Sequence, residues 1–198
     1  LKKLTSITLD DNLLSEIPKE FEKMNQLQIL NASRNKIVTI PDIFKKLPLT
    51  TFGFSDNCIR ELPESLFKIS TLQNLYLSNN YLTQLPEDIS GLSSLQYLDI
   101  SNNKITSLPK NLDKLPQLYT LYCSNNKINS LDANILRNEG IQTIYLSSNK
   151  VKEIINSFPE NYKLQTLDLN SNQLSSLPNN IGNLKGLQYF YISNNKLG

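Results

Sequence analysis

The sequence contains no histidine and only two cysteines, and these absences exclude several classes of function. Without histidine there is no His-based catalytic triad, no imidazole metal ligand and no general base of the commonest kind. Cys58 and Cys123 form no C-x-x-C pair, and the six glycines are scattered rather than gathered in a phosphate-binding loop. We therefore expect no catalytic residue, no metal and no cofactor, and we predict that the chain is not an enzyme.

Long apolar runs and an excess of charge are also missing. No run approaches the roughly 18 apolar residues that a membrane span requires. A formal net charge of +2 on 198 residues gives no reason to expect nucleic acid as a partner. Two cysteines without a disulfide pattern suit a reducing compartment, and the opening LKKLTSITLDD lacks signal-peptide architecture. We predict a cytoplasmic protein.

What the sequence does contain is a repeat that covers it from end to end. The pattern L-x-x-L-x-L-x-x-N-x-L recurs every 23 residues, with one interval of 22 in the second repeat. The repeats begin at residues 4, 27, 49, 72, 95, 118, 141, 164 and 187. We predict one repeat domain over residues 1–198, with eight full repeats and a truncated ninth.

The ninth position of every repeat is asparagine, without exception. The column consists of Asn12, Asn35, Asn57, Asn80, Asn103, Asn126, Asn149, Asn172 and Asn195. A chain that turns into the interior leaves backbone groups unpaired, and an amide side chain offers both donors and an acceptor to bind them. We therefore expect Asn103→Ala to destabilise the protein far more than Asn102→Ala.

The rest of the repeat predicts a strand and a short arm. Positions four to six favour a strand that pairs in parallel with its neighbour, about 4.8 Å away. The back of the repeat reads L-P-x-x-I/L/F-x-x-L, in which proline fixes an extended segment and the apolar residues point inward. The predicted fold is a curved α/β solenoid with a parallel concave sheet and an irregular or short helical convex side.

These two motifs together resemble the leucine-rich-repeat family, over essentially the whole chain. The 23-residue form with L-P-x-x-I-x-x-L resembles the intracellular subclass found in Ras-pathway scaffolds, the repeat region of adenylyl cyclase, and Scribble/Erbin-type repeats. The resemblance implies a scaffold that binds a protein, such as a small GTPase, phosphatase or kinase, in intracellular signalling. Because the motif residues are structural, the resemblance does not identify the partner.

The sixth and seventh repeats depart from the pattern on their convex side. Asp132 and Ile155 stand where proline is expected, and Asn138 and Asn161 where leucine is expected. Tyr162 is a candidate to fill the second gap. These departures indicate either a flexible joint or a local repacking.

The outward strand positions provide the candidate binding surface. Tyrosine and aspartate gather on its middle and later strands, at Tyr76, Tyr97, Asp99, Tyr122, Tyr145, Asp168, Tyr189 and Tyr191. Tyrosine is enriched at binding hot spots because it supplies contact area at low entropic cost. The alternative is that tyrosine simply suits an exposed strand. We predict that a protein partner binds here.

Position ten carries a second column, Lys36, Lys104, Lys127, Lys150 and Lys196. Lysine is depleted at interface centres, so this column is interpreted as a solubility rim. An acidic or phosphorylated partner is the alternative.

Neither end of the repeat array carries a polar cap, which favours a segment of a longer protein. Two alternative functions follow. The chain could be the regulatory repeat region of a multidomain phosphatase, kinase, cyclase or GTPase whose catalytic domain lies outside these residues. It could also form a structural homo-oligomer through its ends.

Overall fold

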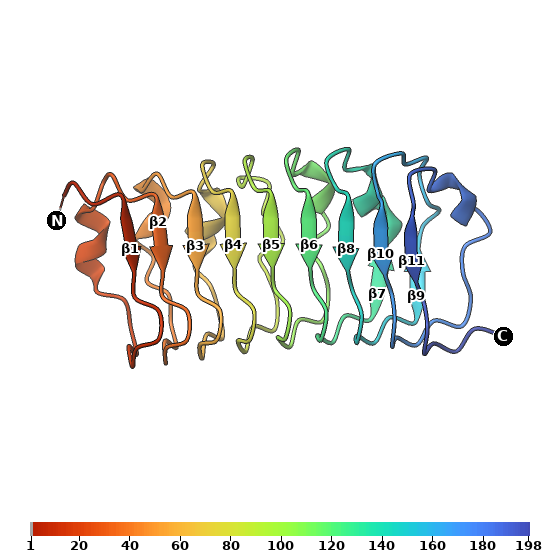
Figure 1. Ribbon diagram of the computed structural model, residues 1–198, viewed down its shortest axis with the longest axis horizontal. Helices are drawn as coiled ribbons and strands as arrows, with labels where there is room; N and C mark the ends of the chain where they lie inside the picture. Colours follow the sequence, from red (N-terminus) through yellow and green to blue (C-terminus); the bar gives the residue numbers. More distant parts are fainter. Residues whose placement is uncertain (1) are drawn as a thin grey trace.

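The computed structural model describes residues 2–198, so the first residue of the predicted domain, Leu1, lies outside the described part. Each repeat contributes one three-residue strand to a nine-stranded parallel sheet, and the two ends of the chain lie at opposite ends of the stack (Figure 1). The strands are β1 (Ser6–Thr8), β2 (Ile29–Asn31), β3 (Thr51–Gly53), β4 (Asn74–Tyr76), β5 (Tyr97–Asp99), β6 (Thr120–Tyr122), β8 (Thr143–Tyr145), β10 (Thr166–Asp168) and β11 (Tyr189–Tyr191). The predicted solenoid with a parallel sheet is therefore confirmed.

The strands pair position for position along the whole sheet. Leu75 of β4 lies beside Leu98 of β5, and the shorter second repeat leaves the register between β2 and β3 unchanged. The strands occupy positions three to five, one residue earlier than the predicted four to six. The amide of Leu77 at position six still donates to the next strand, but from there the backbone bends toward the asparagine turn.

Short 3-10 helices cover the convex side, as the back of the repeat predicts (Figure 1). They are η1 (Lys19–Lys23), η2 (Phe44–Lys46), η3 (Glu64–Lys68), η4 (Leu112–Lys114), η5 (Ala133–Arg137) and η6 (Ile181–Asn183). Pro18 and Pro63 immediately precede η1 and η3, where a fixed φ and a missing N–H carry no penalty. Within residues 2–198, no helix has the length and apolar character to cross a bilayer.

The core lies between the sheet and these arms. Leu98 and Leu121, the central residues of neighbouring strands, are completely buried. Near the N-terminal end, the rings of Phe52 and Phe54 stack at 4.1 Å. Cys123 is also fully buried, as predicted, and desolvation by burial raises the pKa of its thiol far above the ordinary value. Cys123 is therefore an inert core residue.

The asparagine column forms the predicted ladder between repeats. The amide Nδ2 of Asn103 donates to the carbonyl of Leu77 in the preceding repeat at 2.9 Å, and to those of Ile100 and Ser101 in its own repeat at 3.1 Å. Its Oδ1 accepts the backbone N–H of Leu82 at 2.9 Å. One side chain thus satisfies four buried backbone groups in two repeats.

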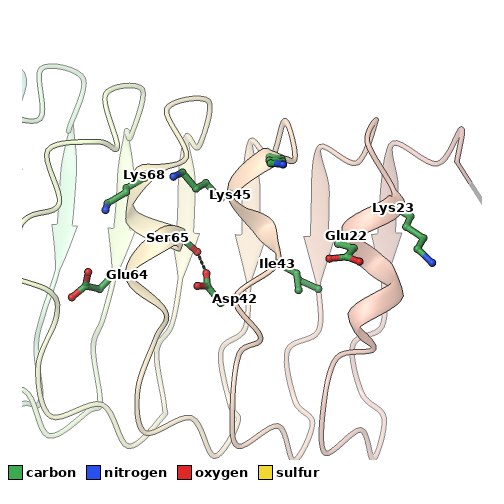
Figure 2. Close-up of a pocket in the computed structure, with 9 residues that line it drawn as sticks. Glu22, Lys23, Asp42, Ile43, Lys45, Glu64, Ser65 and Lys68 are labelled. Carbon is green, nitrogen blue, oxygen red and sulfur yellow. Dashed lines mark hydrogen bonds between the residues drawn. The ribbon is translucent and has the colours of Figure 1, made fainter.

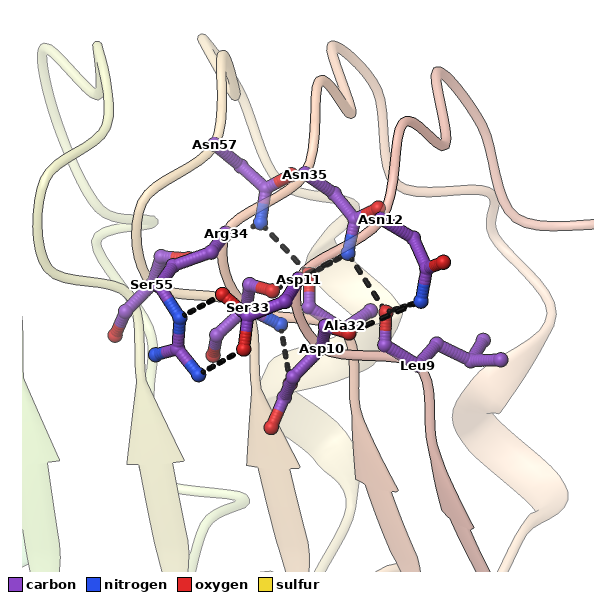
Figure 3. Close-up of polar contacts among 10 residues, drawn as sticks. All are labelled: Leu9, Asp10, Asp11, Asn12, Ala32, Ser33, Arg34, Asn35, Ser55 and Asn57. Carbon is purple, nitrogen blue, oxygen red and sulfur yellow. Dashed lines mark hydrogen bonds and ion pairs between the residues drawn. The ribbon is translucent and has the colours of Figure 1, made fainter.

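The same arrangement begins at the N-terminal end of the stack, where Figure 3 shows Asn12, Asn35 and Asn57 in a row. Beside them, the guanidinium of Arg34 forms a two-pronged ion pair with Asp11, with Nε 2.6 Å from Oδ1 and Nη2 2.8 Å from Oδ2. The hydrogen bond from Arg34 holds the pKa of Asp11 below its usual value. Both side chains are exposed, so the pair is expected to add little stability.

Position eight has a structural role that the sequence analysis missed. Nine consecutive repeats place a non-glycine residue there in the left-handed region, with φ between 53° and 58°: Asp11, Arg34, Asp56, Asn79, Asn102, Asn125, Ser148, Ser171 and Asn194. Asn and Asp tolerate this conformation best, which accounts for most of the column. The left-handed residue turns the chain so that the next residue, the ladder asparagine, points inward.

The two irregular repeats form a second sheet on the convex side. Strand β7 (Ser130–Asp132) pairs in parallel with β9 (Glu153–Ile155), and Asp132 lies beside Ile155. These are the two repeats that lack proline at this position, and proline would weaken such a ladder because it has no N–H to donate. Pro109 and Pro178 occupy the same position in the repeats on either side.

The same repeats use asparagine in place of a convex leucine. Asn138 is 2% exposed, donates to the carbonyls of Leu112 and Leu115 at 3.0 and 2.7 Å, and accepts the N–H of Gly140 at 2.8 Å. Asn161 donates to the carbonyl of Leu136. The departures are therefore a local repacking. The suggestion that Tyr162 fills the gap is wrong, because its side chain is 67% exposed.

Candidate functional site

The predicted surface residues lie on one face of the nine-stranded sheet. Within position five, the register joins six of them into an unbroken row from β4 to β11: Tyr76, Asp99, Tyr122, Tyr145, Asp168 and Tyr191. Tyr97 and Tyr189 stand two residues earlier on the strands of Asp99 and Tyr191, and so share their face. All eight are half-buried or exposed. The structure thus brings the predicted residues together, and their role in binding stays a prediction.

The tyrosine rings are ordered against one another. Tyr122 and Tyr145 stack with ring centroids 5.1 Å apart and planes 15° from parallel. Tyr189 and Tyr191 form a second near-parallel pair at 6.4 Å. Rings that already rest on each other lose little rotational freedom when a ligand covers them, which favours binding.

Tyr119 belongs to this surface and was missed by the sequence analysis. Its ring is 42% exposed and lies 6.2 Å from that of Tyr97. It occupies position two, just before the strand, where the neighbouring repeats carry glutamine (Gln96 and Gln142). The sequence does contain a signal for its role, because Tyr119 is the single aromatic residue at a position that is otherwise polar.

Two carboxylates interrupt the tyrosine row, and both accept hydrogen bonds from residues that follow their own strands. Oδ1 of Asp99 accepts hydrogen bonds from the backbone N–H of Ser101 at 3.0 Å and from its hydroxyl at 2.6 Å. Oδ1 of Asp168 accepts from the N–H of Asn170 at 2.9 Å. In residues 2–198, the hydrogen bonds to these two carboxylates all go to Oδ1, so Oδ2 of each is left for a ligand.

The phenols around Asp99 are held in their neutral form. Partial burial is the main cause that raises the pKa of Tyr76 and Tyr122 above the ordinary value of 10.0. Neighbouring tyrosines and the negative charge of Asp99 raise it further. Near neutral pH both residues therefore remain hydroxyl donors on a surface whose fixed charge is negative.

Toward the N-terminus the row stops at β4 and does not continue onto β3. Gly53 takes the place of the next tyrosine, and the side chain of Asn31 lies over it so closely that a Cβ at Gly53 would collide with the amide oxygen. The tyrosine surface therefore begins at Tyr76 and extends toward β11.

The lysine column lies outside this face. The side chains of Lys104, Lys127 and Lys150 are exposed at position ten, beyond the ends of the strands. Lys104 places its Nζ 4.8 Å from the ring centre of Tyr81, which Arg60 also approaches at 5.6 Å. This arrangement is that of a solvated rim beside the sheet.

Apart from the tyrosine surface, a hollow lies on the convex side between η1, η2 and η3 (Figure 2). It has a volume of about 680 Å³, and its lining mixes acids with bases: Glu22, Lys23, Asp42, Ile43, Lys45, Lys46, Glu64, Ser65 and Lys68. The hydroxyl of Ser65 donates to Asp42 in a solvent-exposed hydrogen bond. With charges of both signs and no enclosed apolar wall, it favours no particular ligand.

A nine-stranded parallel solenoid tied by a buried asparagine ladder, with an aromatic concave face, defines the class as a repeat protein of the protein-binding type. Comparison with known families agrees. A family model described as leucine rich repeat matches residues 48–105, 70–128 and 139–197. A second family model with the same description matches residues 26–47. The chain belongs to the leucine-rich-repeat family.

Two curated relatives are named as serine/threonine-protein kinases, one of them as probably inactive. The chain is 31% identical over 80 residues to a probable inactive serine/threonine-protein kinase, roco10, of Dictyostelium discoideum, covering 38% of this chain and 3% of that protein. It is 30% identical over 102 residues to leucine-rich repeat serine/threonine-protein kinase 1 of Mus musculus, covering 39% of this chain and 5% of that protein. The chain thus spans only a small part of either kinase.

Among solved structures, a leucine-rich-repeat protein of Leptospira interrogans superposes on the whole chain. The TM-score is 0.90 at 32% sequence identity, and the match covers 100% of this chain and 50% of the other. The fold therefore agrees over every repeat.

Proposed function

We propose that this chain is a non-enzymatic protein-interaction module, a scaffold that holds a signalling protein on its concave face in the cytoplasm. The observation that carries the proposal is the unbroken row of tyrosines and aspartates from β4 to β11. The row covers six strands, and the five spacings of about 4.8 Å between them give a strip roughly 24 Å long. This length is sufficient for the centre of a standard protein–protein interface. Both cysteines are free thiols, which supports a reducing compartment.

The test is capture of a partner from cell lysate by the wild type and by a Tyr76→Ala/Tyr122→Ala/Tyr145→Ala variant. Because the three rings lie on the surface, the variant should melt like the wild type and should lose the partner. A Tyr81→Ala/Tyr162→Ala variant is the matched control, since both tyrosines are exposed but lie outside the row. Equal capture by all three proteins would move the binding site away from the concave face.

A second function is favoured by the two kinase relatives: the repeat region of a multidomain signalling enzyme. In this proposal the concave face binds a protein that regulates a catalytic domain carried elsewhere on the same polypeptide. Expression of the full-length gene product, followed by a kinase assay with and without these 198 residues, separates this function from that of an independent scaffold.

A further inference from the structure

The charges on the concave face are few and all of one sign. Positions two, three, five and seven of the nine repeats, which bring side chains to this face, contain no lysine or arginine at all. Their ionised side chains are Asp10 near the N-terminal end and Asp99 and Asp168 within the tyrosine row. The ion pairs in residues 2–198 are Arg34–Asp11 and Lys114–Asp113, so neither Asp99 nor Asp168 has a cationic partner among these residues.

The hydrogen bonds and the neighbours of each of these two carboxylates favour the binding of a cation. Oδ1 accepts hydrogen bonds from the serine or asparagine two residues later, which orients the group, while Oδ2 accepts none from residues 2–198. In the register, Tyr76 and Tyr122 flank Asp99, and Tyr145 and Tyr191 flank Asp168. A carboxylate between phenol rings suits a guanidinium, which donates to the oxygen and stacks its plane on the aromatic face.

The distance between the two carboxylates specifies the ligand further. Asp99 and Asp168 are three strands apart in the row, which corresponds to about 14 Å at a strand spacing of about 4.8 Å. An extended chain rises about 3.4 Å per residue, so residues i and i+4 are also about 14 Å apart and point to the same side. The side chain of residue i+2 falls midway, over the stacked rings of Tyr122 and Tyr145.

We propose that the concave face binds an extended segment of a partner protein that carries two arginines four positions apart, with an apolar residue midway between them. The arginines bind Asp99 and Asp168, and the apolar side chain covers the Tyr122–Tyr145 pair. The proposal rests on the function proposed above and names the chemistry of its partner. The exposed lysines at position ten disfavour a segment with further positive charge on that side.

The probe is a fluorescein-labelled heptapeptide with arginine at its second and sixth positions, leucine at its fourth, and serine or glycine elsewhere. Fluorescence anisotropy with the 198-residue protein measures its affinity. Peptides with the arginines two or three residues apart serve as comparisons, since the first has the wrong span and the second places its arginines on opposite sides. We expect the four-residue spacing to bind about tenfold more tightly than either, and the affinity to fall as salt is added.

The variants Asp99→Asn and Asp168→Asn keep the shape of the side chain and its acceptor oxygen but remove the charge. Each should weaken the four-residue-spaced peptide about tenfold, as loss of one charge-assisted contact predicts. The matched control is Glu87→Gln/Glu160→Gln, which removes two negative charges from exposed positions on the convex side. That variant should change the affinity less than twofold.

Binding that ignores the spacing, that survives both Asp→Asn substitutions, or that is absent at millimolar peptide would overturn the proposal. These outcomes are distinct from failure of the proposed function. If the triple tyrosine variant loses a lysate partner while the arginine peptides fail, the concave face binds a protein but the ligand chemistry is different.

Discussion

Two adjacent residues in each repeat, at positions eight and nine, are often both asparagine and have unrelated roles. Asn103 is 9% exposed and bonds four backbone groups through its side chain. Asn102 is exposed, and what its position requires is a backbone φ of 53°. Position nine, which needs the amide side chain, is asparagine in all nine repeats. Position eight, which needs only the left-handed backbone conformation, also accepts other residue types such as Arg34 and Ser148.

At the residue scale, we expect Asn103→Ala to lower the free energy of unfolding by about 2–4 kcal/mol, because it leaves several buried backbone groups without a partner. Urea unfolding followed by circular dichroism measures the change. Asn102→Gly is the better control than Asn102→Ala, since alanine in the left-handed region costs about 1–2 kcal/mol and glycine adopts it freely. Equal losses for Asn103→Ala and Asn102→Gly would contradict the ladder assignment.

Among the elements, the convex arms of the sixth and seventh repeats differ most from the pattern. Two arms that lack proline have formed the parallel pair β7–β9, and the apolar contact of a leucine has been replaced by hydrogen bonds from Asn138 and Asn161. A buried amide is stable only when its polar atoms are bonded, and here both ends of the Asn138 amide are. The two arms are therefore repacked, with hydrogen bonds in place of the apolar contact.

At the element scale, Asn138→Ala should lower the free energy of unfolding by about 2–3 kcal/mol, because the carbonyls of Leu112 and Leu115 lose their donor inside the arm. Chemical denaturation measures this directly. Asn179→Ala, a truncation of an exposed asparagine on the same side of the solenoid, should change stability by less than about 0.5 kcal/mol. A loss at Asn138 no larger than that at Asn179 would show that the arm is held by other contacts.

For the molecule as a whole, stability depends on neighbouring repeats, because in residues 2–198 each strand pairs with the strands of adjacent repeats. The central residue of β5, Leu98, is completely buried between Leu75 and Leu121. The central residue of β1, Ile7, has one neighbouring strand in this chain and is only half-buried. The same side-chain size therefore contributes differently at the centre and at the end.

At this scale, Leu98→Ala should cost about 2–5 kcal/mol, as expected for a truncation in a packed core. Ile7→Ala removes a side chain of equal size and should cost less than half as much, because part of it already faces water. Thermal unfolding of both variants tests the comparison. Equal costs would indicate that the nine repeats unfold as a single block whose ends are as tightly held as its middle.

The features that recur in every repeat can be predicted from the amino-acid sequence. The asparagine column, the apolar positions and the 23-residue period predict the parallel sheet, the ladder and the convex arms, because each repeat has to satisfy the same geometry against its neighbours. Period-two alternation also placed the tyrosines and aspartates on one face. The sequence does not predict that these residues form a side-by-side row with stacked rings and accessible carboxylate oxygens. That arrangement depends on the register between the strands.

The features that occur once, or that depend on the backbone, become visible only in the folded chain. The pairing of β7 with β9 required two arms without proline to lie next to each other in space, and the bonding of Asn138 required carbonyls from the preceding repeat. The left-handed column at position eight is a constraint on φ that several residue types satisfy, so no single letter marks it. A sequence pattern shows which side chains each position requires. The backbone conformation and the contacts between neighbouring repeats, in contrast, form only when the chain folds.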